Sequence, residues 1–347
     1  MKRSLVRQAV ERMHAYAPGE QPREPGFIKL NTNENPYPPS AAIQEVLQRP
    51  FDRLRLYPDP LCMDLRVELA RLHGRRPEQV FVGNGSDEVL ALCVRAFVER
   101  TGSVGYFEPS YSLYPVLATA EELAVRPVPL NSDFSWAMPA EYAASLFFLT
   151  TPNAPTGVQY PRETVREFCA HFPGVVVLDE AYVDFAREHF MDLALEFDNV
   201  LVARSFSKSY SLAGLRVGYV VGAEPLIGAL FKIKDSYNVD RLAQEIALAA
   251  VLDQKHMRRN VECIQMSREH TAATLRERGF DVGPSESNFL WVKPPRRPAA
   301  EWHAALREQR ILVRHFPGKQ IGAYLRITIG TESEMTALLD ALNAGPI

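Results

Sequence analysis

Five short apolar runs, each followed at once by polar residues or glycine, limit the fold of this chain more than any other feature. Such runs are typical of buried strands, and the segments between them have the spacing of helices. Strands that alternate with helices favour an α/β fold with a mostly parallel sheet flanked by helices. The runs lie at residues 79–82, 103–107, 146–149, 175–178 and 200–203 of the 347-residue chain.

Polar and aromatic residues follow the carboxyl ends of these runs. In a parallel sheet the carboxyl ends of the strands meet at one edge, and ligands bind beyond that edge. Residues that are far apart in the sequence are therefore expected to share one active site. They are the glycine-rich turn at residues 83–86, Tyr111, Asn153, Asp179 and Lys208.

Lys208 lies among small hydroxylated residues and has no acidic neighbour in the sequence. A lysine in a small-residue pocket loses its proton readily, and the neutral amine forms a Schiff base with an aldehyde. Ser205, Ser207 and Arg216 add the hydroxyl groups and the planar cation that bind a phosphate. An aldehyde that carries a phosphate suggests pyridoxal 5'-phosphate (PLP), although a solvated lysine in a serine-rich loop has the same local pattern.

Two further segments each have a functional and a structural interpretation. The turn at residues 83–86 precedes an apolar helix, so its backbone N–H groups can bind phosphate. Ser86 and Asp87 also suit the capping of that helix. Tyr111 follows a strand, where it can stack on a planar ring or belong to the core. From the residues alone, both interpretations stay open for each segment.

The composition excludes several other classes of protein. The formal net charge of −3 leaves no global basic surface for nucleic acid. The four cysteines form no C-x-x-C pair, which argues against a disulfide framework or a zinc site, and we expect no metal. No apolar stretch approaches the roughly 18 residues of a membrane span. Glu11, Arg12 and His14 interrupt the N-terminus before a signal-peptide core, so we expect a cytoplasmic protein.

The character of the sequence changes after residue 222, where long helical patterns replace the short runs. Two strands are expected among them, at residues 288–292 and 324–329. Near the N-terminus, the apolar spacing predicts a helix over residues 4–16. We expect an N-terminal arm at residues 1–39 that packs with the small domain and a dimer partner, a large domain at 40–238 and a smaller α/β domain at 239–347.

Motifs spread over nearly the whole chain match one known family in order and spacing. They are Tyr16-Ala17-Pro18-Gly19, Asn33-Glu34-Asn35-Pro36, Tyr57-Pro58, Gly85-Ser86-Asp87-Glu88, Tyr111, Asp179-Glu180-Ala181-Tyr182, Ser207-Lys208, Gly214-Leu215-Arg216, Asn288, Arg314 and Leu325-Arg326-Ile327-Thr328. The chain resembles the PLP-dependent aminotransferases of the aspartate aminotransferase fold, and among them most the histidinol-phosphate aminotransferases. The resemblance implies a large PLP-binding domain with a mostly parallel sheet of the seven-stranded type, and a smaller α/β domain.

The resemblance also implies a reaction. It is the reversible transfer of an amino group between L-histidinol phosphate and 2-oxoglutarate, which gives imidazole-acetol phosphate and glutamate in histidine biosynthesis. An aromatic amino-acid aminotransferase and a threonine-phosphate decarboxylase are alternatives, because they too need arginines for an anion. A PLP-fold binding or regulatory protein without turnover is an alternative of another class, against which the intact Lys208, Asp179 and Tyr182 argue.

Roles for individual residues follow from the same resemblance. As catalytic residues, Lys208 would bind PLP as a Schiff base and move a proton, Asp179 would pair with the ring nitrogen, and Tyr182 would donate to the ring 3'-oxygen. Tyr57 would reach the cofactor phosphate of a neighbouring subunit, which implies a homodimer. The expected cofactor-binding residues are Tyr57, Ser86, Asp87, Tyr111, Asn153, Asp179, Tyr182, Ser205, Ser207, Lys208 and Arg216, and the expected substrate-binding residues are Tyr16, Asn33, Arg314 and Arg326.

The sequence departs from the pattern of this family in two places. Most relatives read Asn-Asn-Pro-Thr-Gly where this chain has alanine at position 154. The asparagine normally hydrogen-bonds the ring 3'-oxygen, so Ala154 removes that bond unless another donor replaces it. Ser205 stands where threonine is usual and keeps the hydroxyl group. PLP binding is still expected, because the other contacts remain.

Overall fold

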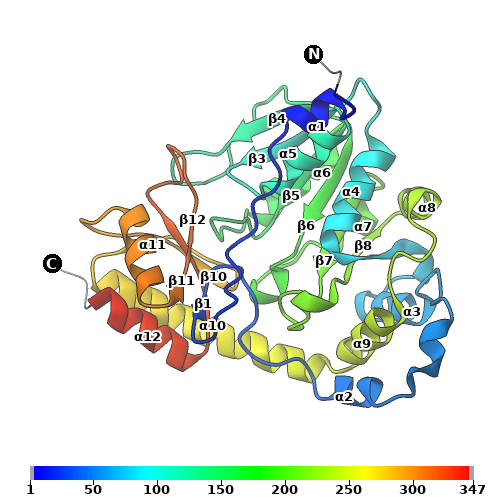
Figure 1. Ribbon diagram of the computed structural model, residues 1–347. Helices are drawn as coiled ribbons and strands as arrows, with labels where there is room; N and C mark the ends of the chain where they lie inside the picture. Colours follow the sequence, from blue (N-terminus) through cyan, green and yellow to red (C-terminus); the bar gives the residue numbers. More distant parts are fainter. Residues whose placement is uncertain (1–3, 344–347) are drawn as a thin grey trace.

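The computed structural model describes residues 4–343, and a seven-stranded sheet with helices on both faces forms its larger part (Figure 1). The strand order is β2-β8-β7-β6-β5-β3-β4; β8 is antiparallel to both its neighbours, and the other pairs are parallel. The prediction of a mostly parallel sheet is confirmed. The strands are β2 (Val80–Gly83), β3 (Ser103–Glu108), β4 (Ala124–Pro129), β5 (Leu146–Thr150), β6 (Val175–Asp179), β7 (Val200–Ser205) and β8 (Gly218–Gly222).

Side chains of the large sheet alternate between two faces, and helices bury both faces. In β5, Leu146 and Phe148 join one hydrophobic cluster, whereas Phe147 and Leu149 join the other. Burial on both faces explains why the strands are apolar throughout instead of alternating with polar residues. One face is covered by α4 (Gly85–Phe97), α5 (Leu113–Ala120) and α8 (Glu224–Ile233), and the other by α3 (Met63–His73), α6 (Arg162–His171) and α7 (Leu193–Glu196).

A smaller part, at the lower left in Figure 1, combines two small sheets with helices. Its four-stranded sheet is antiparallel, in the order β12-β13-β10-β9, and β11 pairs in parallel with β1. Helix α10 contacts α12 of this part and a 3-10 turn of the larger part, so it links the two. The strands are β1 (Ile28–Lys29), β9 (Asp281–Val282), β10 (Phe289–Lys293), β11 (Ile311–Leu312), β12 (Arg314–His315) and β13 (Leu325–Thr328).

The remaining helices surround these sheets. Helices α2 and α3 pack on α9 at the lower right in Figure 1, away from the small sheets. The α-helices are α2 (Ala42–Leu47), α9 (Arg241–Leu252), α10 (Gln254–Glu277), α11 (Ala299–Glu308) and α12 (Glu332–Asn343). The 3-10 turns are η1 (Phe51–Arg55), η2 (Pro77–Gln79), η3 (Val183–Phe185) and η4 (Ala213–Leu215).

The N-terminal segment runs from the large sheet to the small ones (Figure 1). The helix predicted over residues 4–16 is wrong in extent, because α1 covers only Gln8–Arg12. Helix α1 contacts α5, but none of its residues is buried, so packing contributes little that could stabilise a longer helix. Residues 13–27 continue without helix or strand until β1 pairs with β11.

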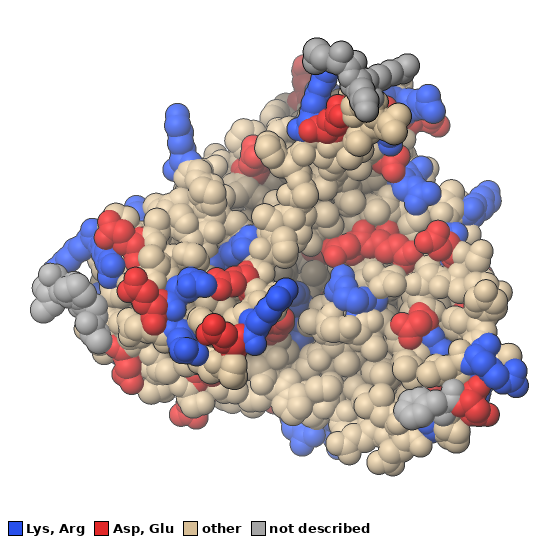
Figure 2. Space-filling model, in the orientation of Figure 1, with Lys and Arg blue, Asp and Glu red and all other residues tan. Residues whose placement is uncertain are grey.

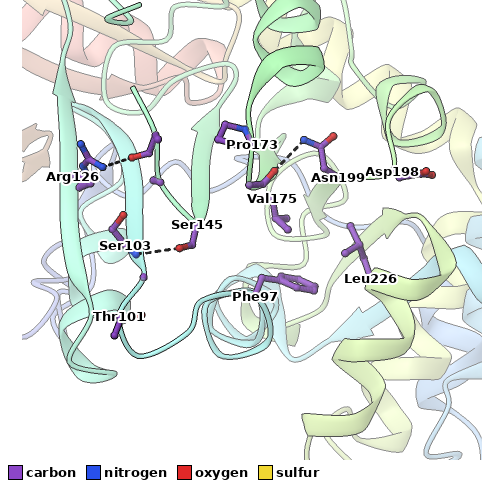
Figure 3. A pocket seen from close by; sticks show the side chains of 14 residues that line it. Phe97, Thr101, Ser103, Arg126, Ser145, Pro173, Val175, Asp198, Asn199 and Leu226 are labelled. Atoms are coloured by element: carbon purple, nitrogen blue, oxygen red, sulfur yellow. Dashed lines mark hydrogen bonds between the residues drawn. The ribbon is translucent and has the colours of Figure 1, made fainter. Parts of the chain in front are cut away.

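A hollow lies at the amino-terminal edge of the large sheet, where β3, β5, β6 and β7 begin (Figure 3). Its polar groups bond to the protein itself. The Ser103 N–H donates to Ser145 Oγ over 3.3 Å, and Arg126 donates to the Ala143 carbonyl. The Asn199 side chain donates to three backbone carbonyls that precede β6. These hydrogen bonds hold the edge together, and they leave the Ser103 N–H and the Asn199 amide nitrogen no capacity for a ligand.

Charged side chains of both signs are interspersed over the face drawn in Figure 2. Within residues 4–343, no helix combines the length and the apolar character that a membrane crossing requires. The four cysteines are free, and Cys62, Cys93 and Cys169 are buried.

Candidate active site

The carboxyl ends of β2, β3, β5, β6 and β7 face one cavity of about 370 Å³. The N-terminal segment and the small part complete its walls. Residues from separate motifs meet there: Tyr16, Asn33, Ser86, Asp87, Tyr111, Asp179, Tyr182, Ser205, Ser207, Lys208, Arg216, Arg314 and Arg326 all line the cavity. Two residues with expected roles, Tyr57 and Asn153, are not among its lining residues.

Lys208 lies half-buried in the loop after β7 and faces the cavity. Its Nζ donates to the Thr32 carbonyl over 3.4 Å and lies 5.8 Å from the centre of the Tyr182 ring. Burial, and then the positive charge of Arg326, lower the pKa of Lys208 to about 8. Near that pH much of the side chain is a neutral amine, which can attack a carbonyl or take up a proton. Lys208 is therefore not a solvated surface lysine.

One corner of the cavity gathers groups whose chemistry suits a phosphate. It lies where α4 begins, and the first N–H groups of a helix have no partner within the helix. The Ser207 N–H donates to Ser205 Oγ over 3.1 Å, and Arg216 Nη1 reaches Ser207 Oγ at 3.4 Å. Arg216 Nη2 also donates to Asp87 Oδ2 at 3.0 Å, which orients the guanidinium beside the helix.

Two glycines allow the chain segments of this corner to approach one another. Gly85 has a φ of +79°, and a Cβ atom there would lie 2.6 Å from Arg216 Nη2. A Cβ atom on Gly218, where β8 begins, would lie 2.5 Å from the backbone nitrogen of Ser86. Glycine is the residue that fits both places. Backbone, hydroxyl groups and a cation thus form a cradle that fits the phosphate group of PLP.

Asp179 is the last residue of β6, and its side chain is buried against α5. Its Oδ2 accepts a hydrogen bond of 2.7 Å from the Tyr114 hydroxyl, and its Oδ1 accepts one of 3.2 Å from the Ala181 N–H. Burial raises the pKa of Asp179 to about 6, and the Tyr114 hydrogen bond opposes this rise. At neutral pH the buried carboxylate therefore gains from a cationic partner in the cavity.

Tyr182 has its hydroxyl oxygen fixed from one side by Asn33. The Asn33 side chain donates to the Tyr182 hydroxyl over 2.9 Å. Asn33 is itself held by two residues near the small sheet, since its Oδ1 accepts from Thr328 and its carbonyl accepts from Asn288. A phenol whose oxygen accepts a hydrogen bond keeps its own hydrogen for another acceptor. Tyr182 is thus oriented as a donor toward the cavity that it lines.

Asn153 is buried behind the wall of the cavity, and its amide is fully engaged. Its Nδ2 donates to the Pro109 carbonyl over 3.1 Å and to Thr156 Oγ1 over 3.0 Å, and its Oδ1 accepts from Ser110. The neighbouring Ala154 lines the cavity and adds no donor. The Asn153 amide is therefore not free to replace the donor that Ala154 lacks.

Arg326, on β13, presents an incompletely bonded guanidinium to the cavity. Its Nη2 donates to the Asn31 carbonyl over 3.1 Å, but its buried Nε has no partner in the part of the chain that the structure describes. The rings of Phe289 and Phe316 lie 5.3 Å from its central carbon. Burial lowers the pKa of Arg326, so an anion beside it would relieve the cost of the buried charge.

Comparison with known proteins is decisive for the family. The family model described as "Aminotransferase class I and II" matches residues 25–342. A protein named histidinol-phosphate aminotransferase, from Microcystis aeruginosa, is 42% identical over 97% of this chain and 97% of its own length. The chain belongs to the histidinol-phosphate aminotransferase family within the class I and II aminotransferases.

Solved structures agree on the fold of this family member. Histidinol-phosphate aminotransferase from Sinorhizobium meliloti, in complex with pyridoxal-5'-phosphate, superposes with a TM-score of 0.85 at 23% identity, covering 98% of this chain and 97% of that one. An aspartate aminotransferase mutant of Thermus thermophilus gives a TM-score of 0.81 at 18% identity, over 97% and 98% of the two chains. The aminotransferase therefore has the aspartate aminotransferase fold.

The N-terminal segment of the aminotransferase covers one side of the cavity. Arg314 donates to the backbone carbonyls of Ala17 and Pro18, at 2.8 and 3.1 Å. Just before them in the chain, Tyr16 packs edge-on against Tyr111, with ring centres 5.7 Å apart. The guanidinium of Arg314 thus ties the small part to the segment that closes the cavity.

Tyr57 lies outside the cavity of its own chain. Its side chain is 77% exposed and stacks on Tyr237, with ring centres 4.3 Å apart. Among the described residues, none that lines the cavity forms a hydrogen bond or a ring contact with this pair. An exposed aromatic pair is a typical contact point for another molecule.

Sequence reasoning missed Tyr114, the hydrogen-bond partner of Asp179. Its spacing of three residues from Tyr111 was the available signal, because such residues share one side of a helical turn. Thr328 and Asn288 belong to recognised motifs, but nothing local indicated that they hold Asn33. That contact joins segments from opposite ends of the chain.

Proposed function

We propose that this aminotransferase uses PLP to transfer an amino group reversibly between L-histidinol phosphate and 2-oxoglutarate, giving imidazole-acetol phosphate and glutamate. This would be a step of histidine biosynthesis in the cytoplasm. The observation that carries the proposal is that Lys208 lies in one cavity with two guanidinium groups suited to anions, Arg216 beside the start of α4 and the incompletely bonded Arg326. The match to relatives of that name over nearly the whole chain supports the choice of substrate.

The residues of the cavity fit PLP as follows. Ser205, Ser207, Arg216 and the start of α4 would hold its phosphate. When bound, PLP supplies an aldehyde and an electron-accepting ring. Asp179 would pair with the ring nitrogen, Tyr182 would donate to the ring 3'-oxygen, and Tyr111 would flank the ring; Lys208 would bind the aldehyde.

The substrate would be held and shielded by residues from the opposite wall. Arg326 would bind the anionic group of the substrate through Nε and the rest of its planar fork. Lys208, with a pKa of about 8, can take up and return a proton at Nζ near the substrate Cα. Tyr16 and the segment tied to Arg314 would exclude water above the substrate.

A homodimer is proposed as the active form, with Tyr57 reaching the cofactor phosphate of the partner subunit. Large apolar side chains are exposed on α2, η1, α3, α9 and the loop between η1 and α3, and a monomer would leave them in water. They are Leu47, Leu54, Leu56, Tyr57, Leu61, Met63, Val67 and Leu252. Sedimentation at micromolar concentration should give the mass of a dimer, and Tyr57→Phe should weaken PLP retention without unfolding the chain. A fully active monomer would exclude this assembly.

A half-reaction screen tests the substrate. Protein loaded with PLP is mixed in turn with L-histidinol phosphate, phenylalanine and threonine phosphate, and the change in cofactor absorbance is followed. Histidinol phosphate should react fastest and should transfer its amino group on to 2-oxoglutarate. A preference for phenylalanine would favour an aromatic aminotransferase, and release of carbon dioxide from threonine phosphate would favour a decarboxylase. No reaction with any amine would leave a binding or regulatory protein.

A further inference from the structure

A continuous row of hydrogen-bonded side chains leads away from Asp179 along the wall of the cavity, which Thr150 and Ser110 also line. The Tyr114 hydroxyl bridges Asp179 Oδ2, at 2.7 Å, and Thr150 Oγ1, at 2.5 Å. Thr150 Oγ1 lies 3.0 Å from Ser110 Oγ, which lies 3.0 Å from Asn153 Oδ1. Three hydroxyl groups from α5, β5 and the loop after β3 thus connect a carboxyl group to an amide oxygen.

The far end of this row is a fixed acceptor. Asn153 Nδ2 lies 3.1 Å from the Pro109 carbonyl, which can only accept. The amide therefore cannot be turned over, because two acceptors would then face each other. Its Oδ1 must face Ser110 and accept from it.

Counting protons shows that the row depends on the charge of Asp179. It contains four contacts, and its three hydroxyl groups supply three hydrogens. With Asp179 ionised, both ends are acceptors and one contact has no hydrogen. With Asp179 protonated there are four hydrogens, and every contact is filled in one direction, from Asp179 to Asn153. Ionisation of Asp179 reverses Tyr114 from acceptor to donor.

We propose that Tyr114, Thr150 and Ser110 are positioning residues that set the charge state of Asp179, and thereby how tightly the protein holds a cationic aromatic ring nitrogen. The inference rests on the proposed function, because the ring nitrogen is that of PLP. Burial favours the neutral acid, whereas Tyr114 as a donor favours the carboxylate. Because these two influences oppose each other, a cationic partner beside Asp179 is enough to favour its ionised form.

Other charged groups near Asp179 act on it more weakly. Asp87 on α4 and Glu180, the next residue in the chain, both disfavour its ionisation. Arg216 pairs with Asp87 at 3.0 Å, and Arg204 pairs with Glu180 at 2.8 Å, so each of these carboxylates has its own cation. The Tyr114 hydroxyl is then the strongest influence favouring the carboxylate.

The test compares the pH dependence of PLP binding between variants. Protein freed of PLP is titrated with PLP by fluorescence at several pH values between about 5 and 9, a range that spans the pKa of Asp179, and the dissociation constant is plotted against pH. Tyr114→Phe removes the donor, so the carboxyl group becomes neutral at a higher pH. A hydrogen bond to a charged group corresponds to a shift of about one pH unit or more. As the pH is lowered, the affinity of Tyr114→Phe for PLP should therefore begin to fall at a pH about one unit higher than in the wild type.

Two variants separate positioning from packing. Thr150→Val keeps the shape of the side chain and removes the acceptor that the Tyr114 hydrogen needs when Asp179 is protonated. It should therefore favour the carboxylate and shift the curve in the opposite direction, to lower pH. Tyr160→Phe is the matched control, because the buried Tyr160 hydroxyl has no partner among the described residues. It should leave the curve unchanged. Lys208 titrates in every variant, so differences between variants report on Asp179.

A second measurement does not need PLP. The infrared band of a protonated carboxyl group, assigned with Asp179→Asn, should persist to higher pH in Tyr114→Phe than in wild-type protein. Coincident curves for Tyr114→Phe, Thr150→Val and wild type in both measurements would overturn the inference while the half-reactions stand. Failure of the wild type to bind PLP would instead overturn the proposed function, and the infrared titration would still decide the role of Tyr114.

Discussion

The amino-terminal and carboxyl-terminal edges of the large sheet both end in polar hollows, and they differ in how their polar groups are satisfied. At the amino-terminal edge, Asn199, Ser103 and Arg126 bond to groups of the protein itself (Figure 3). In the cavity at the carboxyl-terminal edge, Arg326, which the small sheet contributes, keeps a buried Nε without a described partner, and Lys208 has one long contact. The hollow at one end of the large sheet is thus closed to a ligand, and the cavity at the other end is open to one.

Polar groups that are fully hydrogen-bonded serve stability, whereas polar groups that lack a partner can bind a ligand. Buried polar groups in folded proteins are nearly always hydrogen-bonded, because an unpaired group costs free energy. Saturated groups, such as the Asn199 amide nitrogen, contribute stability and have nothing left for a ligand. The incompletely bonded groups of the cavity cost stability in the free protein, and a ligand that supplies the missing partners would recover it. Substitutions at the amino-terminal edge should therefore lower the free energy of unfolding and spare activity, whereas substitutions in the cavity should lower activity and spare stability.

The largest effect is expected in the open cavity, from Lys208→Ala. This variant removes both the amine that would bind PLP and the group that would carry the proton. Turnover should fall by at least about 10²–10⁴-fold, with PLP still bound without a covalent bond. Steady-state kinetics measures the loss, and borohydride reduction of the wild type should fix the cofactor on the peptide with Lys208. A label on Lys232 or Lys234 would contradict the assignment.

Arg326→Lys should lower the catalytic efficiency toward histidinol phosphate at least tenfold. Lysine keeps the charge but loses the planar fork, and a charged hydrogen bond contributes about 1.5–3 kcal/mol. The ratio kcat/KM for histidinol phosphate and for phenylalanine measures the effect. Arg297→Lys, on the surface, is the control and should change neither value. If Arg326→Lys lowers kcat/KM for phenylalanine and leaves that for histidinol phosphate unchanged, the result would favour the aromatic aminotransferase alternative.

Asn199→Ala tests the closed hollow. It leaves three backbone carbonyls without their donor, so the free energy of unfolding should fall by about 1–3 kcal/mol. Denaturant unfolding measures this change, and kcat should stay at the wild-type value. Asp198→Ala, at the exposed neighbouring position, should change stability by less than about 0.5 kcal/mol. If Asn199→Ala lost activity and kept its free energy of unfolding, the proposed difference between the two edges would be wrong.

The smallest effect is expected from Ala154→Asn, which adds a donor to the open cavity. A donor at the ring 3'-oxygen favours its charged form, so the pH at which the absorbance of the bound cofactor changes should fall by about one unit. A spectrophotometric titration of PLP-loaded protein measures this midpoint. Ala154→Val adds volume without a donor and should not lower it. An unchanged midpoint in Ala154→Asn would mean that Tyr182 already satisfies the oxygen.

Much of the fold could be predicted because the central strands are buried on both faces. Burial leaves short apolar runs that end sharply at β5, β6 and β7, and the end of each run pointed to the site. The edge strand β4 gave no such signal, because most of its residues are exposed and it contains two prolines. The domain boundaries near residues 39 and 238 stay predictions.

The site was less predictable where a residue acts through another residue. Lys208 and Arg216 belong to one local stretch whose chemistry can be read directly. Tyr114 acts on Asp179 across the sheet, and Asn153 turned out to bond to Pro109 instead of facing the cavity. Such contacts depend on tertiary packing, which no local spacing encodes.

The contact of Asn33 with Thr328 has a consequence for protein synthesis. Tyr182 is oriented by Asn33, which is held by residues near the end of the chain. A chain translated only as far as residue 325 contains neither Arg326 nor Thr328, so it can neither hold Asn33 through Thr328 nor present the Arg326 guanidinium. The site is therefore completed only when nearly the whole chain has been made, although most of its residues precede residue 217.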